Sequence, residues 1–389
     1  MFSKAMSNER KFWLFCAMTF VSFVTVSMLS YLSVILSDLG YGSEQLGVLL
    51  AFPLVPTLVG MLLCGELSSR FGVLFCVKSG VLLMLGGYLA QAVCISNFEA
   101  MLLIRGLHGL GYGIFFPAAM MYAKQIVPKE QLVYYFGIYS CMIPTPNLIG
   151  PWIAERLYAV CSIESYFLLT AVPLLIGGLG IWGMMNQRGT AQNSTLIRES
   201  YAAVFANNRA LIPLVGIFCV GIIYGFIPSY MALFLKQKTV SVSLFFSSFT
   251  AVLLICRFYL LRFVSEVDRT LLVALGFLLM ACSYIIADMS TFYGGILASG
   301  AVFGVGYSVV YPNLSVYLAL CFPEEQRRKP IAVFNMLFFS GIYLTPLCGG
   351  VIIEQSSTSF FLGMLCSLSL LCALGVGAMY CVSRWKRCC

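Results

Sequence analysis

The sequence predicts an all-α integral membrane protein in which twelve transmembrane helices form two six-helix bundles related by a pseudo-two-fold axis. Three observations support this prediction: the composition, the succession of long apolar segments, and an internal repeat. Of the 389 residues, 60% are hydrophobic and only 10% are charged, and the mean hydropathy is +0.94. In soluble domains roughly a quarter of all residues are charged, so this composition excludes a soluble fold.

Twelve apolar segments are each long enough to cross a bilayer, which takes about 20 residues. They are 12–36, 46–64, 79–97, 100–123, 132–154, 165–185, 211–235, 243–261, 270–287, 292–320, 330–353 and 358–383. The first is too long for a signal-peptide core and has no small-residue cleavage site after it, so we expect it to stay as the first span. The short connections leave no room for a soluble catalytic domain.

The basic residues predict the orientation. With the amino terminus in the cytoplasm, 19 of the 23 Lys and Arg residues fall on the cytoplasmic side. The opposite side receives only Arg156, Lys236 and Lys238, and Arg105 lies within a span. This asymmetry predicts that both termini are cytoplasmic. The net charge of +8 therefore reflects topology, and we expect no nucleic-acid partner because the chain has no soluble basic face.

The longest polar segment divides the chain into two halves of six spans. We expect an N-terminal six-helix bundle at 1–185, a cytoplasmic linker at 186–210 and a C-terminal six-helix bundle at 211–389. The two halves are similar in sequence at a constant offset of 195 residues. Residues 109–131 and 304–326 share Gly109/Gly304, Gly111/Gly306, Tyr112/Tyr307, Pro117/Pro312, Pro128/Pro323, Glu130/Glu325 and Gln131/Gln326. Six spans bring the chain back to its starting side, so this is a parallel repeat, an architecture typical of transport by alternating access.

The loop after the second span carries the first of three family motifs. Residues 65–72 match a G-x-L-a-D-R-x-G-R-R pattern at Gly65, Leu67, Arg70 and Gly72, but Ser69 replaces its aspartate. The fourth span matches R-x-x-x-G-x-G-x-G through Arg105, Gly109, Gly111 and Gly113. The fifth span ends in an antiporter-like pair, Gly150 and Pro151. The antiporter pattern is incomplete, because Pro146 and Ala154-Glu155 stand where it has glycines.

Through these motifs the chain resembles the major facilitator superfamily over essentially its whole length, and most closely its effluxers of drugs, sugars and metabolites. The resemblance implies that Arg105 takes part in substrate binding or proton coupling. It also implies that the loop at Gly65, Arg70 and Gly72 latches the outward-facing state. Without the aspartate, such a latch depends on Arg70 and on loop packing.

Arg105 and His108 are the strongest candidates for substrate binding or coupling. A charge inside a span is costly and usually faces the bundle interior or a watery cavity. His108 lies three residues on, along the same helical face, and histidine titrates near physiological pH. Two structural alternatives stay open: backbone carbonyls bind Arg105 and hold span four against span five, and His108 is a hydrogen-bonded spacer.

No Asp or Glu lies inside any predicted span, so the only formal charge within the spans is positive. We therefore expect a cavity that favours an anion or a neutral polyol over a lipophilic cation. Further polar candidates lie in spans that line the cavity in this family. They are Tyr112, Asn147, Tyr224, Tyr307, Tyr311, Asn313 and Asn335. Aromatic faces with few polar groups suit a small organic ligand, although each residue has ordinary helix packing as its alternative.

The glycines and prolines are candidates for conformational roles. Gly109, Gly111 and Gly113 let neighbouring helices approach closely. Gly150-Pro151 is interpreted as a hinge, with a static kink as the alternative, because proline removes a backbone donor.

We expect a secondary active transporter of a small polar or anionic solute, working as a proton-coupled exporter; a carboxylate metallophore fits the positive cavity. The alternative is an importer of a similar solute. The sequence contains no nucleotide motif and no catalytic constellation, so ATP drive and enzymatic activity are not expected. Its sixteen cysteines form no metal-binding pattern, so we expect neither metal nor cofactor. A monomer in a bacterial inner membrane is expected, and a non-transporting sensor stays open.

Overall fold

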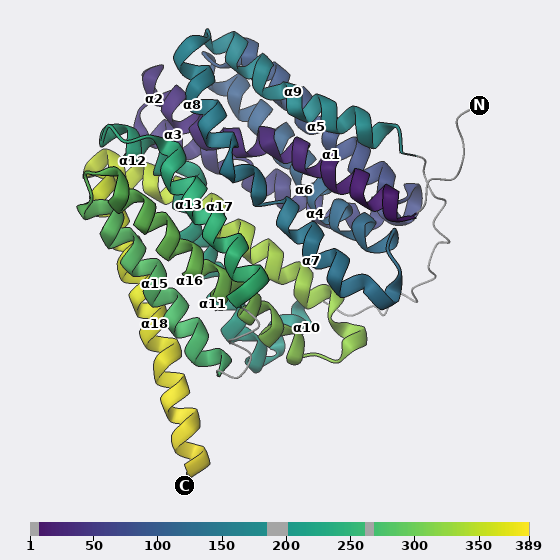
Figure 1. The fold of residues 1–389 in the computed structure, drawn as a ribbon, viewed down its shortest axis with the longest axis vertical. Helices are drawn as coiled ribbons and strands as arrows, with labels where there is room; N and C mark the ends of the chain where they lie inside the picture. The colour runs from purple at the N-terminus through teal and green to yellow at the C-terminus, as the bar shows by residue number, and fades with distance from the viewer. Residues whose placement is uncertain (1–7, 185–200, 261–267, 389) are drawn as a thin grey trace. The chain divides into compact units, whose positions relative to one another are not determined.

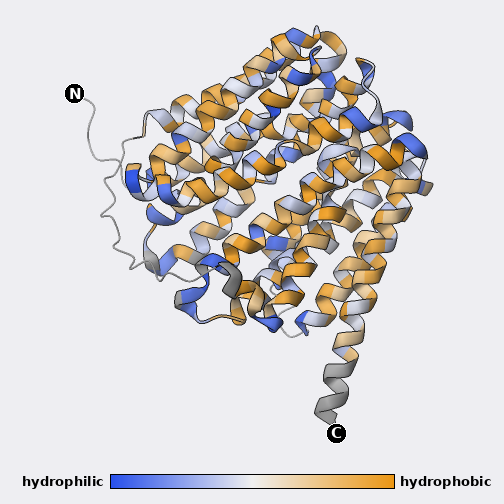
Figure 2. Cartoon of the chain, turned by 180° about the vertical axis from the view of Figure 1, so that it is seen from behind, coloured by the Kyte–Doolittle hydropathy of each residue, from blue (hydrophilic) through white to orange (hydrophobic). Residues whose placement is uncertain are grey.

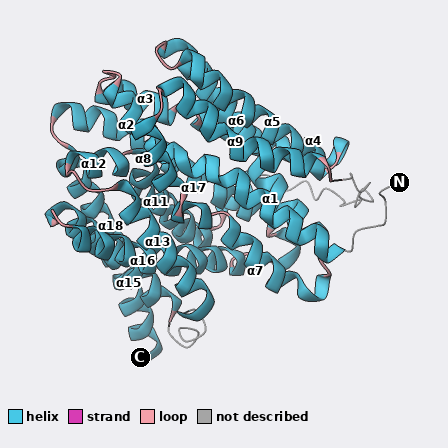
Figure 3. Ribbon diagram, turned by 45° about the horizontal axis from the view of Figure 1, so that its top comes forward, coloured by secondary structure: helices cyan, strands magenta, loops and turns pink. Residues whose placement is uncertain are grey.

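The computed structural model describes residues 8–184, 201–260 and 268–388, and within these ranges every regular element is a helix (Figures 1 and 3). Ten of the described helices are long and apolar enough to cross a membrane. Apolar residues cover most of the length of these helices, and hydrophilic residues gather at their ends and turns (Figure 2). This pattern is that of a multi-pass membrane protein.

Two of the predicted spans are not among the ten, for separate physical reasons. Helix α6 (Phe98–Gln125) is 28 residues long, but its glycines, Arg105 and His108 lower its hydropathy. The fifth predicted span is interrupted: it consists of α7 (Leu132–Met142), the short helix η3 (Thr145–Leu148) and α8 (Gly150–Val160). Prolines at the interruption lack the backbone N–H that a continuous helix needs.

The chain divides into two compact units. Unit 1 comprises Met1–Ile35 and Phe52–Leu196, and unit 2 comprises Leu36–Ala51 and Ile197–Cys389. One segment distinguishes these units from the two predicted halves. Leu36–Ala51 belongs to the first half of the sequence but packs in unit 2. Of the predicted linker, residues 186–200 lie outside the described residues.

Unit 1 contains the helices of the first six predicted spans, except for the residues of the first two spans that lie within Leu36–Ala51. Besides α6, α7 and α8 they are α1 (Asn8–Met28), α4 (Leu54–Phe71), α5 (Val73–Cys94) and α9 (Ile163–Trp182). Helices α5 and α6 are antiparallel and approach closely at glycines. A Cβ atom on Gly111 would lie 2.8 Å from the amide nitrogen of Met84 and 2.9 Å from the carbonyl oxygen of Gly80. Small residues permit this kind of close helix packing in membranes.

Unit 2 repeats the same helix pair with α15 (Arg269–Met289) and α16 (Tyr293–Leu320). Gly276 and Gly306 meet there as Gly80 and Gly111 meet in unit 1: a Cβ on Gly306 would lie 2.6 Å from the carbonyl oxygen of Gly276. The repeat seen in the sequence is therefore a repeat of packing.

Within the described residues, unit 2 contains seven further helices besides those of this pair and its short turns. Its other helices are α3 (Ser43–Ala51), α10 (Tyr201–Ala206), α11 (Asn208–Ser229), α12 (Met231–Gln237), α13 (Val242–Ile255), α17 (Arg328–Gln355) and α18 (Thr358–Cys388). Helix α18 packs along α15, and its last turns extend beyond that helix (Figure 1).

The segment Leu36–Ala51 is held in unit 2 by polar and close backbone contacts. Lys236 Nζ lies 2.7 and 2.5 Å from the two carboxylate oxygens of Asp38, at the end of α2 (Leu32–Asp38). The backbone N–H of Ser43 donates to Glu354 Oε2 at 2.8 Å, and a Cβ on Gly47 would lie 2.9 Å from the Cα of Gly350. Helix α3 is thus fixed against α17.

Candidate functional site

A buried polar group lies inside unit 1, on α5 and α6. Helix α6 begins after Asn97, whose side chain accepts from the backbone N–H of Ala100. Two turns further on, Arg105 is 5% exposed and His108 is 4% exposed. Among the described residues, Arg105 is the only charged side chain that is buried. A buried cation of this kind is costly in a protein interior and is typical of a functional position in a membrane.

His108 packs on Tyr88 of α5. The two rings are edge to face, with centroids 5.0 Å apart. The hydroxyl of Tyr88 donates to the backbone oxygen of Thr25 on α1, so it is engaged away from the imidazole. Within the described part of the chain, neither ring nitrogen of His108 has a hydrogen-bond partner. The expected alternative, a hydrogen-bonded spacer, is therefore not what the structure shows.

Gln91 on α5 is a further member of this group, and the sequence analysis did not identify it. Its side chain is 0% exposed, and neither its amide nitrogen nor its amide oxygen has a partner among the described residues. It follows Gly87 by one helical turn, and a Cβ on Gly87 would lie 3.3 Å from the Cβ of His108. The antiparallel packing of α5 and α6 thus places Gln91 beside the turn that carries Arg105 and His108. An amide inside an apolar segment was the available signal.

Each side of α6 has its own neighbours. Gly109 and Gly113 face α4, where a Cβ on Gly109 would lie 2.8 Å from Pro53 and Gly113 meets the backbone of Thr57. Tyr112 follows Arg105 by seven residues and His108 by four, so the three side chains lie along one face of the helix. Tyr112 stacks on Phe116 at 5.7 Å and meets Phe23 of α1 at 6.3 Å.

Four of the predicted site residues come together in unit 2. Tyr224 of α11 stacks on Tyr307 of α16 at 5.0 Å, and Tyr307 lies 5.8 Å from Tyr311. The hydroxyl of Tyr311 donates to Asn335 Oδ1 on α17 at 3.1 Å. All four side chains are half-buried. They form an aromatic wall with polar atoms at one end, which suits contact with a small organic molecule.

Asn313 and Asn147 have other surroundings. The amide nitrogen of Asn313 donates to the carbonyl oxygen of Val309 in its own helix at 2.8 Å. Asn147 lies in η3, and its backbone N–H donates to the carbonyl oxygen of Pro144 at 2.9 Å. Directly after it, Gly150 and Pro151 open α8, where Gly150 packs against Ser27 of α1. The hydrogen bond of Asn313 gives that side chain a structural explanation.

The loop between α4 and α5 contains an ion pair and a glycine turn with positive φ. Arg70 Nε lies 2.6 Å from Glu66 Oε1, one turn earlier on α4, and both side chains are exposed. Gly72 has φ of +88°, in the left-handed region that glycine adopts at low cost. Gly65 has open space where a Cβ would stand. Because Ser69 carries no charge, Glu66 is the carboxylate that pairs with Arg70, and an exposed pair contributes little, about 0–1 kcal/mol.

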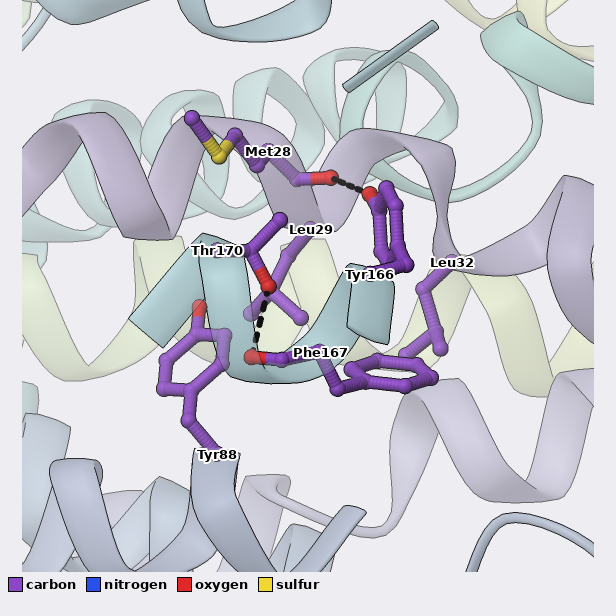
Figure 4. Close-up of a pocket in the computed structure, with 7 residues that line it drawn as sticks. All are labelled: Met28, Leu29, Leu32, Tyr88, Tyr166, Phe167 and Thr170. Atoms are coloured by element: carbon purple, nitrogen blue, oxygen red, sulfur yellow. Dashed lines mark hydrogen bonds between the residues drawn. The ribbon is translucent and has the colours of Figure 1, made fainter. Parts of the chain in front are cut away.

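A small cavity with a volume of about 10 Å³ lies in unit 1, next to Tyr88, the residue that packs on His108 (Figure 4). It is lined by Met28, Leu29, Leu32, Tyr88, Tyr166, Phe167 and Thr170. The figure shows the hydroxyl of Tyr166 donating to the backbone oxygen of Met28, and that of Thr170 donating to the backbone oxygen of Phe167 one turn earlier in α9. A volume of this size holds about one water molecule, so this cavity is not a solute site. Within the described residues, no group of three or more His, Cys, Asp or Glu side chains is placed to hold a metal.

Comparison with known proteins gives a consistent result over the whole chain. The model of the family described as Major Facilitator Superfamily matches residues 14–265 and 238–384. The staphylopine export protein of Staphylococcus aureus is 20% identical over 326 residues, covering 79% of this chain and 80% of that protein. The 4-hydroxybenzoate transporter PcaK of Acinetobacter baylyi is 29% identical over 146 residues, 36% of this chain and 30% of that protein.

Solved structures share the fold at low sequence identity. The nucleoside transporter NupG has a TM-score of 0.78 at 13% identity, covering 95% of this chain and 98% of that one. A D-xylose–proton symporter has a TM-score of 0.73 at 16% identity, covering 95% and 96%.

Proposed function

Since this chain belongs to the major facilitator superfamily, we propose that it exports a small organic anion by proton-coupled alternating access. The chain is an integral multi-pass membrane protein and a secondary transporter, not an enzyme. The proposal concerns the solute, the coupling ion and the direction.

The burial of Arg105 is the observation that carries the proposal. A guanidinium keeps its charge at every physiological pH, and it binds carboxylates through two parallel hydrogen bonds. No Asp or Glu is buried among the described residues, so the buried charge in this part of the chain is positive. An anionic solute gains from this charge, whereas a cation is repelled by it.

The aromatic wall of unit 2 supports a small organic solute over an inorganic ion. Tyr224, Tyr307 and Tyr311 offer ring faces, and the Tyr311–Asn335 pair adds a polar edge. The relatives support the solute class and the direction: one is named for 4-hydroxybenzoate, a carboxylate, and another is named for export.

His108 is the residue that we propose for proton coupling. It lies one helical turn from Arg105, and imidazole exchanges a proton within the physiological pH range. A protonated His108 adds a second positive charge beside Arg105, so proton binding and anion binding strengthen each other. This reinforcement favours a second candidate function, import of the anion together with a proton.

We further propose that both termini lie in the cytoplasm, as the charge asymmetry of the sequence indicates. We also propose that the protein works as a monomer in a bacterial inner membrane.

An untargeted comparison of small molecules in cells and spent medium, with and without this protein, tests the proposal. A carboxylate that accumulates in cells lacking the protein and disappears from their medium is the expected result. A carboxylate left unconsumed in the medium of those cells supports import instead. Loss of a cation or of an uncharged solute from the medium contradicts the anion assignment.

A further inference from the structure

Gln91, Arg105 and His108 are an addition to a helix pair that packs without them. Gly80 and Gly276 align α5 with α15 at an offset of 196 residues, and α6 aligns with α16 at the offset of 195. The residues corresponding to Gln91, Arg105 and His108 are therefore Ala287, Gly300 and Phe303. The contact between Gly80 and Gly111 nevertheless has its equivalent in unit 2, between Gly276 and Gly306. The fold therefore has no need of the amide, the guanidinium or the imidazole at these positions.

The polar groups at this level of the two helix pairs also differ in how they are satisfied. In unit 2, Ser283 and Ser299 bond each other's backbone oxygens at 2.8 Å, so that both hydroxyls are engaged. In unit 1, Gln91 and His108 are buried, and their four side-chain nitrogen and oxygen atoms have no partner among the described residues. Burying polar groups in this state costs about 1–3 kcal/mol each, which a ligand with matching atoms recovers.

The chemistry of the three side chains defines what such a ligand contains. Arg105 has only donors, which suit a carboxylate. Gln91 presents an amide oxygen that needs a donor, and a neutral His108 has one donor and one acceptor. A bare carboxylate has no hydrogen to give to the Gln91 oxygen. A carboxylate with a hydroxyl or amino group on the neighbouring carbon has one.

We propose that Gln91 selects the solute, and that Gln91, His108 and Arg105 together bind a carboxylate carrying a 2-hydroxyl or 2-amino group. This inference rests on the proposed transport of an organic anion and narrows its substrate class. Arg105 binds the carboxylate, and the Gln91 amide oxygen accepts from the adjacent O–H or N–H.

The test uses three probes that share a four-carbon dicarboxylate skeleton: malate with a 2-hydroxyl, aspartate with a 2-amino group and succinate with neither. Binding of each to the purified full-length protein in lipid nanodiscs is measured by calorimetry. The variants are Gln91→Leu, Gln91→Ala and Gln355→Leu. Gln91→Ala introduces the residue found at the corresponding position of unit 2, and it covers the case in which leucine prevents folding. Gln355→Leu removes an exposed amide from the end of α17 and is the matched control.

We expect wild-type protein and Gln355→Leu to bind malate, aspartate or both at least about tenfold more tightly than succinate, as one added hydrogen bond provides. In both Gln91 variants we expect that preference to disappear while succinate binding is kept. Comparing malate with aspartate separates the hydroxyl from the amine. Equal binding of all three probes by wild type, a preference that survives in Gln91→Leu and Gln91→Ala, or binding of none of them overturns the inference. None of these outcomes alters the separate dependence of solute flux on Arg105, so anion transport is judged independently.

Discussion

His108 packs on Tyr88 in unit 1 at the position where Phe303 packs on Tyr284 in unit 2, with the rings edge to face at 88° in the first pair and tilted at 37° in the second. The ring centroids are 5.0 Å apart in the first pair and 5.5 Å apart in the second. In both pairs the tyrosine hydroxyl donates to a backbone oxygen of another helix of its unit, that of Thr25 on α1 or that of Ile223 on α11. The position that the phenyl ring of Phe303 occupies in unit 2 is thus occupied in unit 1 by the imidazole of His108, which can bind a proton.

This equivalence predicts the result of His108→Phe. A phenylalanine fits against a tyrosine at this position in unit 2, so we expect the variant to fold and to unfold within a few degrees of the wild-type temperature. Since the ring then has no titratable nitrogen, solute flux should lose its dependence on a pH gradient. Flux into vesicles with and without a gradient measures this. A variant that folds and keeps wild-type coupling would show that His108 does not carry the proton.

The glycine contact between α5 and α6 predicts a stability effect at Gly111. A valine there places its Cβ under 3 Å from the backbone of Met84 and Gly80, both of which are fixed in helix α5. Overpacking of this kind typically costs about 1–3 kcal/mol. We expect Gly111→Val to lower the unfolding temperature. Size-exclusion chromatography with fluorescence detection, after heating of the samples, measures this temperature. Gly65→Ala is the control, because nothing lies within 4 Å of an added Cβ at that position. Equal stability of the two variants would contradict this packing.

The ion pair between Asp38 and Lys236 predicts how firmly Leu36–Ala51 is held. Their side chains are 39% and 41% exposed, so the pair contributes at most about 1 kcal/mol. Asp38→Lys places like charges together, and we expect backbone hydrogen exchange in this segment to accelerate several-fold. The double variant Asp38→Lys/Lys236→Asp restores opposite charges and should return exchange to the wild-type rate. Failure of the double variant to restore protection would mean that the pair does not hold the segment.

The composition and the long apolar segments predict the helical class and ten of the twelve spans, because an apolar stretch of about 20 residues indicates one crossing. The matching glycines of the two halves predict the repeat of packing. Contacts between distant segments are not encoded in this local way. The packing of Leu36–Ala51 in unit 2 depends on Asp38 meeting Lys236, which lies 198 residues away. The interruption at η3 follows from clustered prolines, whose effect on the path of a helix depends on its neighbours.

The candidate site was predictable only in part. Arg105 and His108 are recognisable because charged and titratable groups are rare within spans. Gln91 carries no charge, and its importance becomes visible only when its burial and its place opposite α6 are known. Tyr224, Tyr307, Tyr311 and Asn335 were identified by residue type, and the structure adds that they are in mutual contact.

The proposed anion transport depends most directly on the charge of Arg105. Solute flux through the Arg105→Lys and Arg105→Gln variant proteins measures the role of this charge. The control is Arg156→Gln, which removes an exposed arginine from α8. Losing a hydrogen bond to a charged group costs about 1.5–3 kcal/mol, which corresponds to about a tenfold to hundredfold change. At equal protein levels we expect partial flux of the carboxylate for lysine, a loss of that size for glutamine, and wild-type flux for the control. Equal flux in wild type and both Arg105 variants would contradict the assignment.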